Sequence, residues 1–215
     1  MNKINLVIIT CFLTFFLSWY WQSDLIVEYF AFSGNNLLNI KFWTPVTALF
    51  LHGDLLHLLG NMLFLFVFGN TLENEVEAKK TLSIFFIGGI LSFLLSLFFY
   101  SLDTYMIGAS AAIFTLTAVV MLIKPLKFSF LFLMPQGLVA IIYFVYNVIL
   151  AYINHQSNVA FISHVIGFLI GIPAGIAWSE DWAKNLLITI GLFLLFLFLT
   201  IFLIPNIMAF LQANG

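Results

Sequence analysis

Long apolar runs alternate with short polar segments along this chain of 215 residues. A helix that crosses the hydrocarbon core of a bilayer needs about 20 predominantly apolar residues. Seven runs approach this length: Ile4–Trp21, Leu55–Gly69, Thr81–Leu102, Ala109–Ile123, Gly137–Ile153, Val159–Trp178 and Asn185–Ile204. The segments between them are short, apart from the one that follows the first run. The pattern predicts seven transmembrane helices that form a single domain over residues 1–215.

Composition indicates that lipid is the main solvent of the protein. Hydrophobic residues make up 63% of the chain and charged residues only 7%, with a mean hydropathy of +1.14. A soluble domain carries about 25% charged residues. The net charge of −2 carries no information about nucleic acid, and the lack of a basic cluster argues against a nucleic-acid partner. We therefore expect an all-α membrane protein built as a polytopic helix bundle in the lipid bilayer.

The lysines predict which ends of the helices face the cytoplasm. The chain has seven lysines and no arginine. With the N-terminus inside, six lysines lie on the cytoplasmic side and only Lys41 lies outside. Cytoplasmic loops of membrane proteins carry an excess of basic residues. We expect a multi-pass protein of the cell membrane (plasma or inner membrane), with a cytoplasmic N-terminus and an external C-terminus.

Polar side chains gather at one depth within three of the predicted helices: His57 and Asn61, Ser110, and His164. All three helices are predicted to run from outside to inside. A rise of about 1.5 Å per residue puts Ser110, His164 and His57 roughly 20–22 Å above the inner boundary. Polar residues at membrane depth are costly, which favours a functional role. We expect the four side chains to face one recess that opens to the outside.

Small residues predict close contact between the helices that carry Ser110 and His164. His164 is followed by Gly167 and Gly171, and Ser110 lies in the small-residue run Gly108–Ala112. Such faces let transmembrane helices approach closely, and Gly167 lies one turn from His164 on the same face. Ser110 Oγ is therefore expected within hydrogen-bond reach of the imidazole, the geometry by which a base activates a weak hydroxyl nucleophile.

The remaining parts of a catalytic site are assigned by role. No Asp or Glu lies at this depth, so the pattern predicts a serine–histidine dyad. Backbone N–H groups at Ala109 and Ser110 lie near a helix start and lack an intrahelical partner. With the side chains of His57 and Asn61, they are expected to hold an oxyanion. Phe114, one turn after Ser110, is expected to pack against the histidine ring.

Each of these residues also has a structural explanation. A serine in an apolar helix usually bonds its own backbone, a membrane histidine often links two helices, and G-x-x-x-G is common in helix packing. Glu73, Glu75 and Glu77, at the inner boundary, are interpreted as a solvated loop rather than an acid–base pair.

A metal site is a further hypothesis, and it would draw on the four histidines His52, His57, His155 and His164. His52 and His57 are five residues apart, unlike the i, i+4 pair of H-E-x-x-H, and no glutamate follows His52 as that motif requires. The pattern therefore favours a site without a metal ion.

Three blocks of residues occur in order along the chain. The first spans 43–73 and holds the pattern H-x4-H-x3-N as His52, His57 and Asn61. The second is G-x-S, as Gly108, Ala109 and Ser110. The third is H-x-x-G-x-x-x-G, as His164, Gly167 and Gly171. On these residues the chain resembles the rhomboid family of intramembrane serine proteases.

The resemblance implies a six-helix core over about residues 1–180, with the predicted helix at about 185–204 as an added seventh. Ser110 would be the nucleophile and His164 the base. The histidine that matches His52 supports the first loop in this family and is not catalytic.

The activity implied is cleavage of transmembrane segments of other membrane proteins near the outer face. His57 and Asn61 would stabilise the oxyanion, and neither a metal ion nor a nucleotide cofactor takes part. An alternative is a catalytically silent relative that binds transmembrane helices to retain or deliver them. Such a relative is expected to lose the nucleophile or the base, and this chain keeps Ser110 and His164.

The chain departs from the family pattern at two positions. Trp43-Thr44 stands where Trp-Arg is usual, which removes a cation expected to steady the first loop, roughly residues 22–41. Ala111 stands where a glycine usually follows the serine, and it is expected to tighten the backbone approach at the oxyanion. Neither change removes a reacting group.

Overall fold

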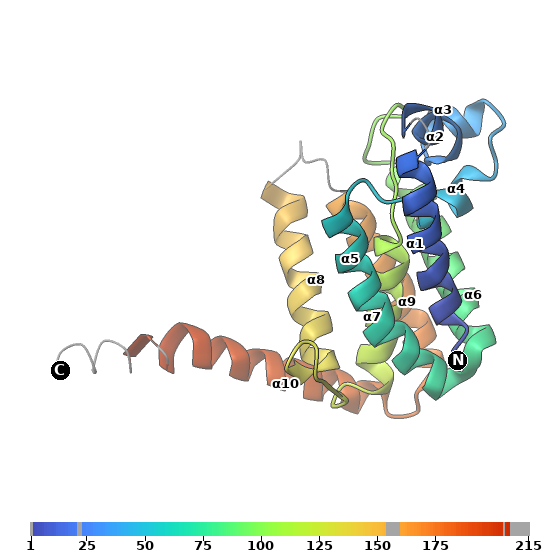
Figure 1. Ribbon diagram of the computed structural model, residues 1–215. Coiled ribbons are helices and arrows are strands. Elements are labelled where there is room, and N and C mark those ends of the chain that lie inside the picture. Colours follow the sequence, from blue (N-terminus) through green and yellow to red (C-terminus); the bar gives the residue numbers. More distant parts are fainter. Residues whose placement is uncertain (1, 21–22, 154–159, 204, 207–215) are drawn as a thin grey trace.

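The computed structural model describes residues 2–20, 23–153, 160–203 and 205–206, and it is almost entirely helical (Figure 1). The first half contains α1 (Ile4–Tyr20), α2 (Ser23–Phe30), α3 (Gly34–Leu38), α4 (Thr44–Thr47), the 3-10 helix η1 (Ala48–Phe50), α5 (Leu55–Phe64), the π-helix η2 (Leu65–Gly69) and α6 (Asn70–Ser96). The second half contains α7 (Ser110–Ile123), the short strands β1 (Phe128–Ser129) and β2 (Met134–Pro135), α8 (Gln136–Ile153), α9 (Phe161–Trp178), α10 (Trp182–Phe198) and the π-helix η3 (Leu199–Leu203).

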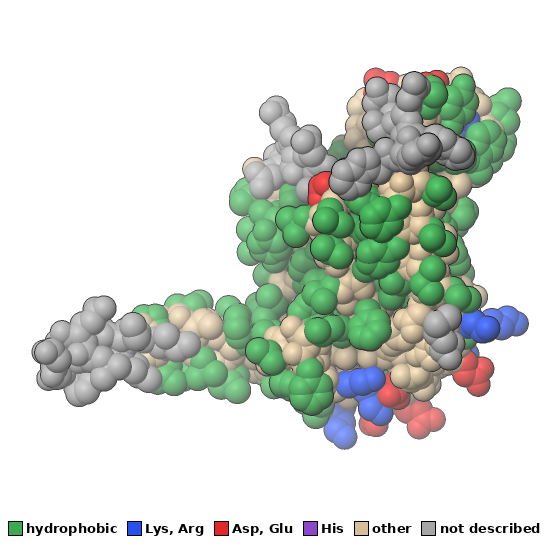
Figure 2. Space-filling model, in the orientation of Figure 1, with side chains coloured by type: hydrophobic (Ala, Val, Ile, Leu, Met, Phe, Trp, Pro, Cys, Tyr) green, Lys and Arg blue, Asp and Glu red, His purple; other side chains and the backbone are tan. Residues whose placement is uncertain are grey.

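The lengths and composition of these helices suit a membrane. Within the described residues, four segments are long and apolar enough to cross one: Leu55–Ser96, Gln136–Ile153, Phe161–Trp178 and Trp182–Leu203. Two shorter helices are also apolar, Ile4–Ser18 and Ser110–Ile123. Apolar side chains cover the sides of the bundle, and most charged side chains lie toward its ends (Figure 2). The prediction of an all-α polytopic membrane bundle is confirmed.

The segment Leu55–Ser96 is divided at Glu77, which has φ 74° and ψ 160° inside α6. Residues 55–76 form one limb, and residues 78–96 form a second limb that returns through the bundle (Figure 1). The first limb therefore continues beyond the end predicted at Gly69.

Two of the glutamates interpreted as a solvated loop are helical, so that interpretation was wrong for them. The carboxylate of Glu73 accepts hydrogen bonds from the backbone N–H groups of Lys3 and Ile4, at 2.6 and 2.8 Å. Glu75 forms an ion pair with Lys124 at 3.3 Å. These side chains fasten the start of α1 and the end of α7 to α6.

Helix α7 forms the centre of the bundle, and its residues 111–122 are all buried. Helix α9 meets it through Gly167 and Gly171, where an added Cβ would overlap backbone carbonyl oxygens of α7. Thr115 Oγ1 of α7 also donates to the Gly167 carbonyl at 2.9 Å. The close approach predicted from the glycines is present, and the two helices touch backbone to backbone.

The segment that leads into α7 is held by the first loop. Phe32 and Met106 exchange two backbone hydrogen bonds of 3.1 and 2.7 Å. Two residues later, Gly108 N donates to the Ala48 carbonyl at 2.8 Å. The position of the first residue of α7 therefore depends on the loop that contains α2 to α4.

A cation still steadies this loop, although Thr44 replaces the usual arginine. Lys41 Nζ donates to the Glu28 carbonyl at 2.9 Å and lies 4.4 Å from the centroid of the Tyr29 ring. Thr44 Oγ1 in turn donates to the Lys41 carbonyl at 2.9 Å. Lys41 thus supplies, three residues earlier, the positive charge expected to be missing.

Helix α10 leaves the base of the bundle and runs crosswise to the other helices (Figure 1). Its most apolar window has a mean hydropathy of 3.0, and only 6% of it is buried by protein. Its apolar surface therefore requires lipid. The helix begins at Trp182, slightly before the predicted Asn185, and the division into a six-helix core and a seventh crossing helix stays a prediction.

Candidate active site

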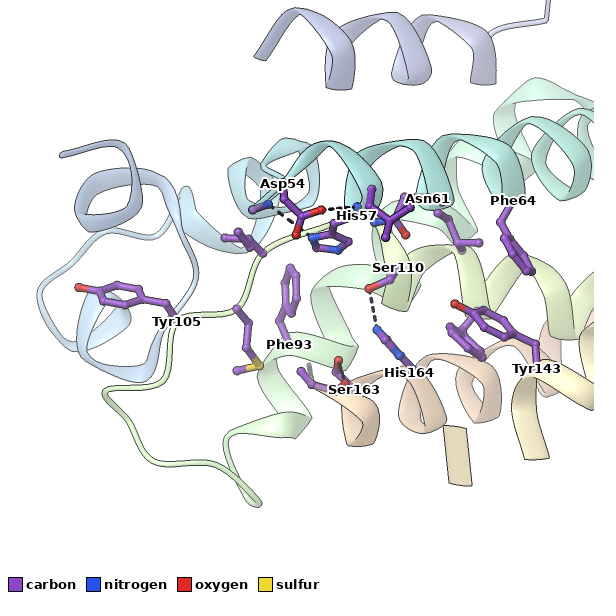
Figure 3. A pocket seen from close by; sticks show the side chains of 18 residues that line it. Asp54, His57, Asn61, Phe64, Phe93, Tyr105, Ser110, Tyr143, Ser163 and His164 are labelled. Atoms are coloured by element: carbon purple, nitrogen blue, oxygen red, sulfur yellow. Dashed lines mark hydrogen bonds between the residues drawn. The ribbon is translucent and has the colours of Figure 1, made fainter. Parts of the chain in front are cut away.

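A cavity of about 580 Å³ lies between α5, α7, α8 and α9 and the segment before α7 (Figure 3). Aromatic side chains, among them Phe64, Phe93 and Tyr143, form much of its wall. Its polar lining includes all four side chains that the sequence places at one depth: His57, Asn61, Ser110 and His164. The structure thus brings these residues, far apart in the chain, to one recess.

Ser110 and His164 face each other across this cavity, with 2.7 Å between Ser110 Oγ and His164 Nε2 (Figure 3). Ser110 is the first residue of α7, and His164 lies in the first turn of α9. The contact of Gly167 with α7, one turn further on, sets their separation. A hydroxyl so close to an imidazole nitrogen has the geometry needed for proton transfer.

A stack of aromatic rings fixes the plane of the His164 imidazole. The Phe114 ring lies nearly parallel to it, with centroids 4.9 Å apart and an angle of 10° between the planes. Tyr143 of α8 stacks on Phe114 at 4.6 Å, and Phe64 of α5 stacks on Tyr143 at 4.5 Å. The imidazole is therefore supported by three helices.

Hydrogen-bond donors gather at the start of α7. Ala109 precedes the helix without a side-chain cap, and the Ile113 N–H donates to its carbonyl at 2.9 Å. The N–H groups of the first turn have no intrahelical acceptor. Asn61 Nδ2 lines the same cavity and, within the part of the chain that is described, is buried without a hydrogen-bond partner.

These donors suit an oxygen that acquires negative charge. A buried amide donor without a partner is rare in proteins, and free helix N–H groups favour anions. At Gly108 an added Cβ would lie 2.8 Å from His57 Nε2 and 3.5 Å from Asn61 Nδ2. Both side chains therefore point at the backbone that leads into Ser110, as Figure 3 also shows.

His52 supports this region from outside the cavity. It lies between η1 and α5, and its ring meets the His57 ring edge to face, with centroids 5.1 Å apart. Its Nδ1 lies 3.3 Å from the Phe50 carbonyl oxygen. Burial, followed by the nearby His57, lowers the pKa of His52 to about 4, so the ring is neutral at neutral pH.

One polar partner of His164 was not predicted from the sequence. Asn147 of α8 is buried, and its Oδ1 lies 2.8 Å from His164 Nδ1, on the ring edge opposite to Ser110. Only acidic residues were expected as a third partner. Its depth could have indicated the amide, because Asn147 lies eleven residues into α8, roughly 17 Å along the helix from Gln136.

The histidines are not clustered as a metal site where the structure describes them. Among these residues, no group of three or more His, Cys, Asp or Glu side chains is arranged to hold a metal ion. Both ring nitrogens of His164 contact protein side chains, Ser110 and Asn147. His155, also named in the metal hypothesis, lies outside the described residues.

Replacing Gly108 by alanine is expected to lower the free energy of unfolding by about 1–3 kcal/mol, because Gly108 has φ +107° and its new methyl group would press on His57. Thermal unfolding of the purified protein measures this change. Gly53→Ala is the matched control, since an added Cβ there meets only the Ile107 side chain at 3.8 Å. Equal stability of the two variants would contradict this account of the backbone at Gly108.

The chain matches a known protein family over most of its length. A family model, the Rhomboid domain, matches residues 39–181, which is more than half of the chain. A comparison with curated proteins found no match. The matched region includes the segment before α5 and extends through α9, so it contains the whole polar lining of the cavity. The chain therefore belongs to the rhomboid family.

Proposed function

We propose that this chain is an intramembrane serine endopeptidase that cleaves transmembrane segments of other membrane proteins. The observation that carries the proposal is the 2.7 Å hydrogen bond between Ser110 Oγ and His164 Nε2. It lies in a cavity that also presents Asn61 Nδ2, a donor with no partner among the described residues. Rhomboid proteins are generally intramembrane serine proteases, which agrees with this chemistry.

In the proposed reaction, Ser110 Oγ attacks the carbonyl carbon of the scissile peptide bond while its proton passes to His164 Nε2. The carbonyl oxygen becomes an oxyanion and accepts hydrogen bonds from first-turn N–H groups of α7, from Asn61 and from His57. His164 then gives its proton to the leaving amine nitrogen, the C–N bond breaks, and an acyl ester of Ser110 remains. A water molecule, deprotonated by His164, hydrolyses that ester and restores the serine.

The proposed setting is the cell membrane, with the N-terminus in the cytoplasm and the C-terminus outside. Six of the seven lysines then face the cytoplasm, which supports this orientation. Ser110 and His164 lie at the ends of α7 and α9 that would face outward, so substrate helices would be cut near the outer face. Helices α1 to α9, about residues 1–180, would form the catalytic core. Helix α10, which runs crosswise to the bundle in Figure 1, would have to turn in order to cross as a seventh span.

Two measurements on the purified protein in liposomes test the function. We expect cleavage of a reporter transmembrane segment with a metal chelator present, because His164 carries every proton transfer in the proposed reaction and no step uses a metal ion. We also expect a fluorophosphonate probe, which reacts with activated serine hydroxyls, to add its mass to the peptide that contains Ser110.

The contrary outcomes separate the alternatives. Binding of reporter helices without cleavage, and without labelling of Ser110, would replace the proposal by the catalytically silent relative that retains or delivers membrane helices. Cleavage that stops in the chelator would overturn the metal-free serine mechanism.

A further inference from the structure

Helix α8 holds the His164 imidazole at two places. Tyr143 supports the face of the ring through the Phe114 stack, at centroid separations of 4.6 and 4.9 Å. One turn further along α8, Asn147 Oδ1 lies 2.8 Å from Nδ1 on the ring edge. The second contact is unusual for this helix, which is otherwise dominated by apolar and aromatic residues.

The orientation of the Asn147 amide follows from its other contact. Its Nδ2 donates to the Tyr143 carbonyl at 2.9 Å. If the amide were turned over, its oxygen would face that carbonyl oxygen, and two acceptors would meet in a buried place. Burying acceptors without donors is costly. The oxygen of Asn147 must therefore face His164, and the side chain is 2% exposed, so water does not compete for this contact.

An oxygen at this position selects one form of the neutral imidazole. A neutral histidine carries its proton on one ring nitrogen, and the other nitrogen accepts. Because Asn147 Oδ1 can only accept, the proton belongs on Nδ1. Nε2 is then left with its lone pair toward Ser110 Oγ, 2.7 Å away. The opposite tautomer would place two acceptors together at Nδ1 and would point an N–H at the serine oxygen.

We propose that Asn147 is a positioning residue that keeps the His164 proton on Nδ1 and thereby leaves Nε2 ready to accept the Ser110 proton. This inference rests on the proposed serine mechanism for its effect on rate, but the tautomer itself exists without any reaction. The site is then a serine–histidine–asparagine arrangement, assembled from α7, α9 and α8, in place of a dyad.

The amide also remains bonded during the reaction. When His164 takes the serine proton, both of its ring nitrogens carry hydrogen, and Nδ1–H still donates to Asn147 Oδ1. No rearrangement is required at this edge between the two charge states. A preorganised acceptor of this kind lowers the barrier because it needs no reorientation as charge develops.

Two variants test the role, and both remove the Nδ2 hydrogen bond to the Tyr143 carbonyl, so the comparison between them isolates the acceptor at the ring edge. Asn147→Leu fills a similar volume and cannot accept a hydrogen bond, whereas Asn147→Asp keeps an acceptor at the same position. Val148→Ala is the control, because Val148 is the next residue of α8 and is 40% exposed. We expect Asn147→Leu to lower kcat at least about 10-fold with little change in KM. Asn147→Asp is expected to retain more of kcat than Asn147→Leu does.

Nitrogen NMR of the full chain with 15N-labelled histidine measures the tautomer independently of activity. The His164 signals are assigned by their loss in His164→Phe. In the wild type we expect a protonated Nδ1 and an unprotonated Nε2. In Asn147→Leu we expect a mixture of tautomers, and in Val148→Ala the wild-type pattern. Thermal unfolding of each variant shows whether it has kept its fold.

The outcomes distinguish this inference from the proposed function. An unprotonated Nδ1 in the wild type, or an unchanged tautomer and kcat in folded Asn147→Leu, would overturn the role of Asn147. If Asn147→Leu is unfolded, the wild-type spectrum and the kcat of Asn147→Asp still test whether Asn147 positions the imidazole. A tautomer that depends on Asn147 in a protein that cleaves no reporter would uphold the positioning role while the protease assignment fails.

Discussion

Ser110→Ala is expected to reduce kcat for reporter cleavage by about 10⁴-fold or more, because it removes the oxygen that would form the acyl ester. Removing the nucleophile of a serine protease leaves only the contribution of the oxyanion site and of substrate binding. The fold should survive, since within the described residues the hydroxyl hydrogen-bonds only to His164 Nε2. Rates of cleavage in liposomes, at matched amounts of folded protein, measure the loss.

A double variant sharpens this test. Ser110 and His164 act as one unit, so Ser110→Ala combined with His164→Ala is expected to be scarcely less active than Ser110→Ala alone. Ser163→Ala is the matched control, because Ser163 lines the same cavity but its hydroxyl donates to the Ala160 carbonyl at 2.6 Å. Cleavage by Ser110→Ala at the rate of Ser163→Ala would exclude Ser110 as the nucleophile.

Gly171→Leu is expected to lower the free energy of unfolding by about 3 kcal/mol or more, and to abolish cleavage in any protein that still folds. The added side chain would overlap the Thr115 carbonyl oxygen of α7, which belongs to the backbone and cannot rotate away. Overpacking of a tight contact typically costs 1–3 kcal/mol, and more where neither side can yield. Denaturation in detergent micelles measures the change.

Gly191→Leu provides the comparison for that substitution. Gly191 lies in α10, where an added Cβ meets no atom of the described residues within 4 Å, so the same side chain should be accommodated there with almost no loss of stability. Similar stability of Gly171→Leu and Gly191→Leu would show that α7 and α9 do not depend on their glycine contact.

Much of the bundle could be predicted because lipid imposes a simple pattern on sequence. Apolar run length gave the membrane helices, and the glycines after His164 gave the contact between α7 and α9. The shared depth of Ser110 and Asn61 predicted that they would line one cavity, and they do. These inferences depend on local spacing, which the helix converts directly into position.

Other features depend on contacts that spacing does not reveal. No glycine or proline marks the turn at Glu77, an exposed residue with a positive φ. The contact of Asn147 with His164 does not follow from spacing either, because an isolated amide in an apolar helix carries no motif that pairs it with an imidazole on another helix. The cation at Lys41 was not expected either, since its contact with Glu28 requires the first loop to fold back.

The glycine contact between α7 and α9 also decides how the protein should respond to its bilayer. No side-chain rotamer lies between the two backbones at Gly167 and Gly171, so that distance has little room to adjust when acyl chains are lengthened or shortened. Hydrophobic mismatch acts instead where helices meet through side chains, as α8 meets α7 through the stack of Tyr143 on Phe114. Because α8 also carries Asn147 and Tyr143, bilayer thickness would affect the setting of the imidazole while the spacing between serine and histidine stays constant.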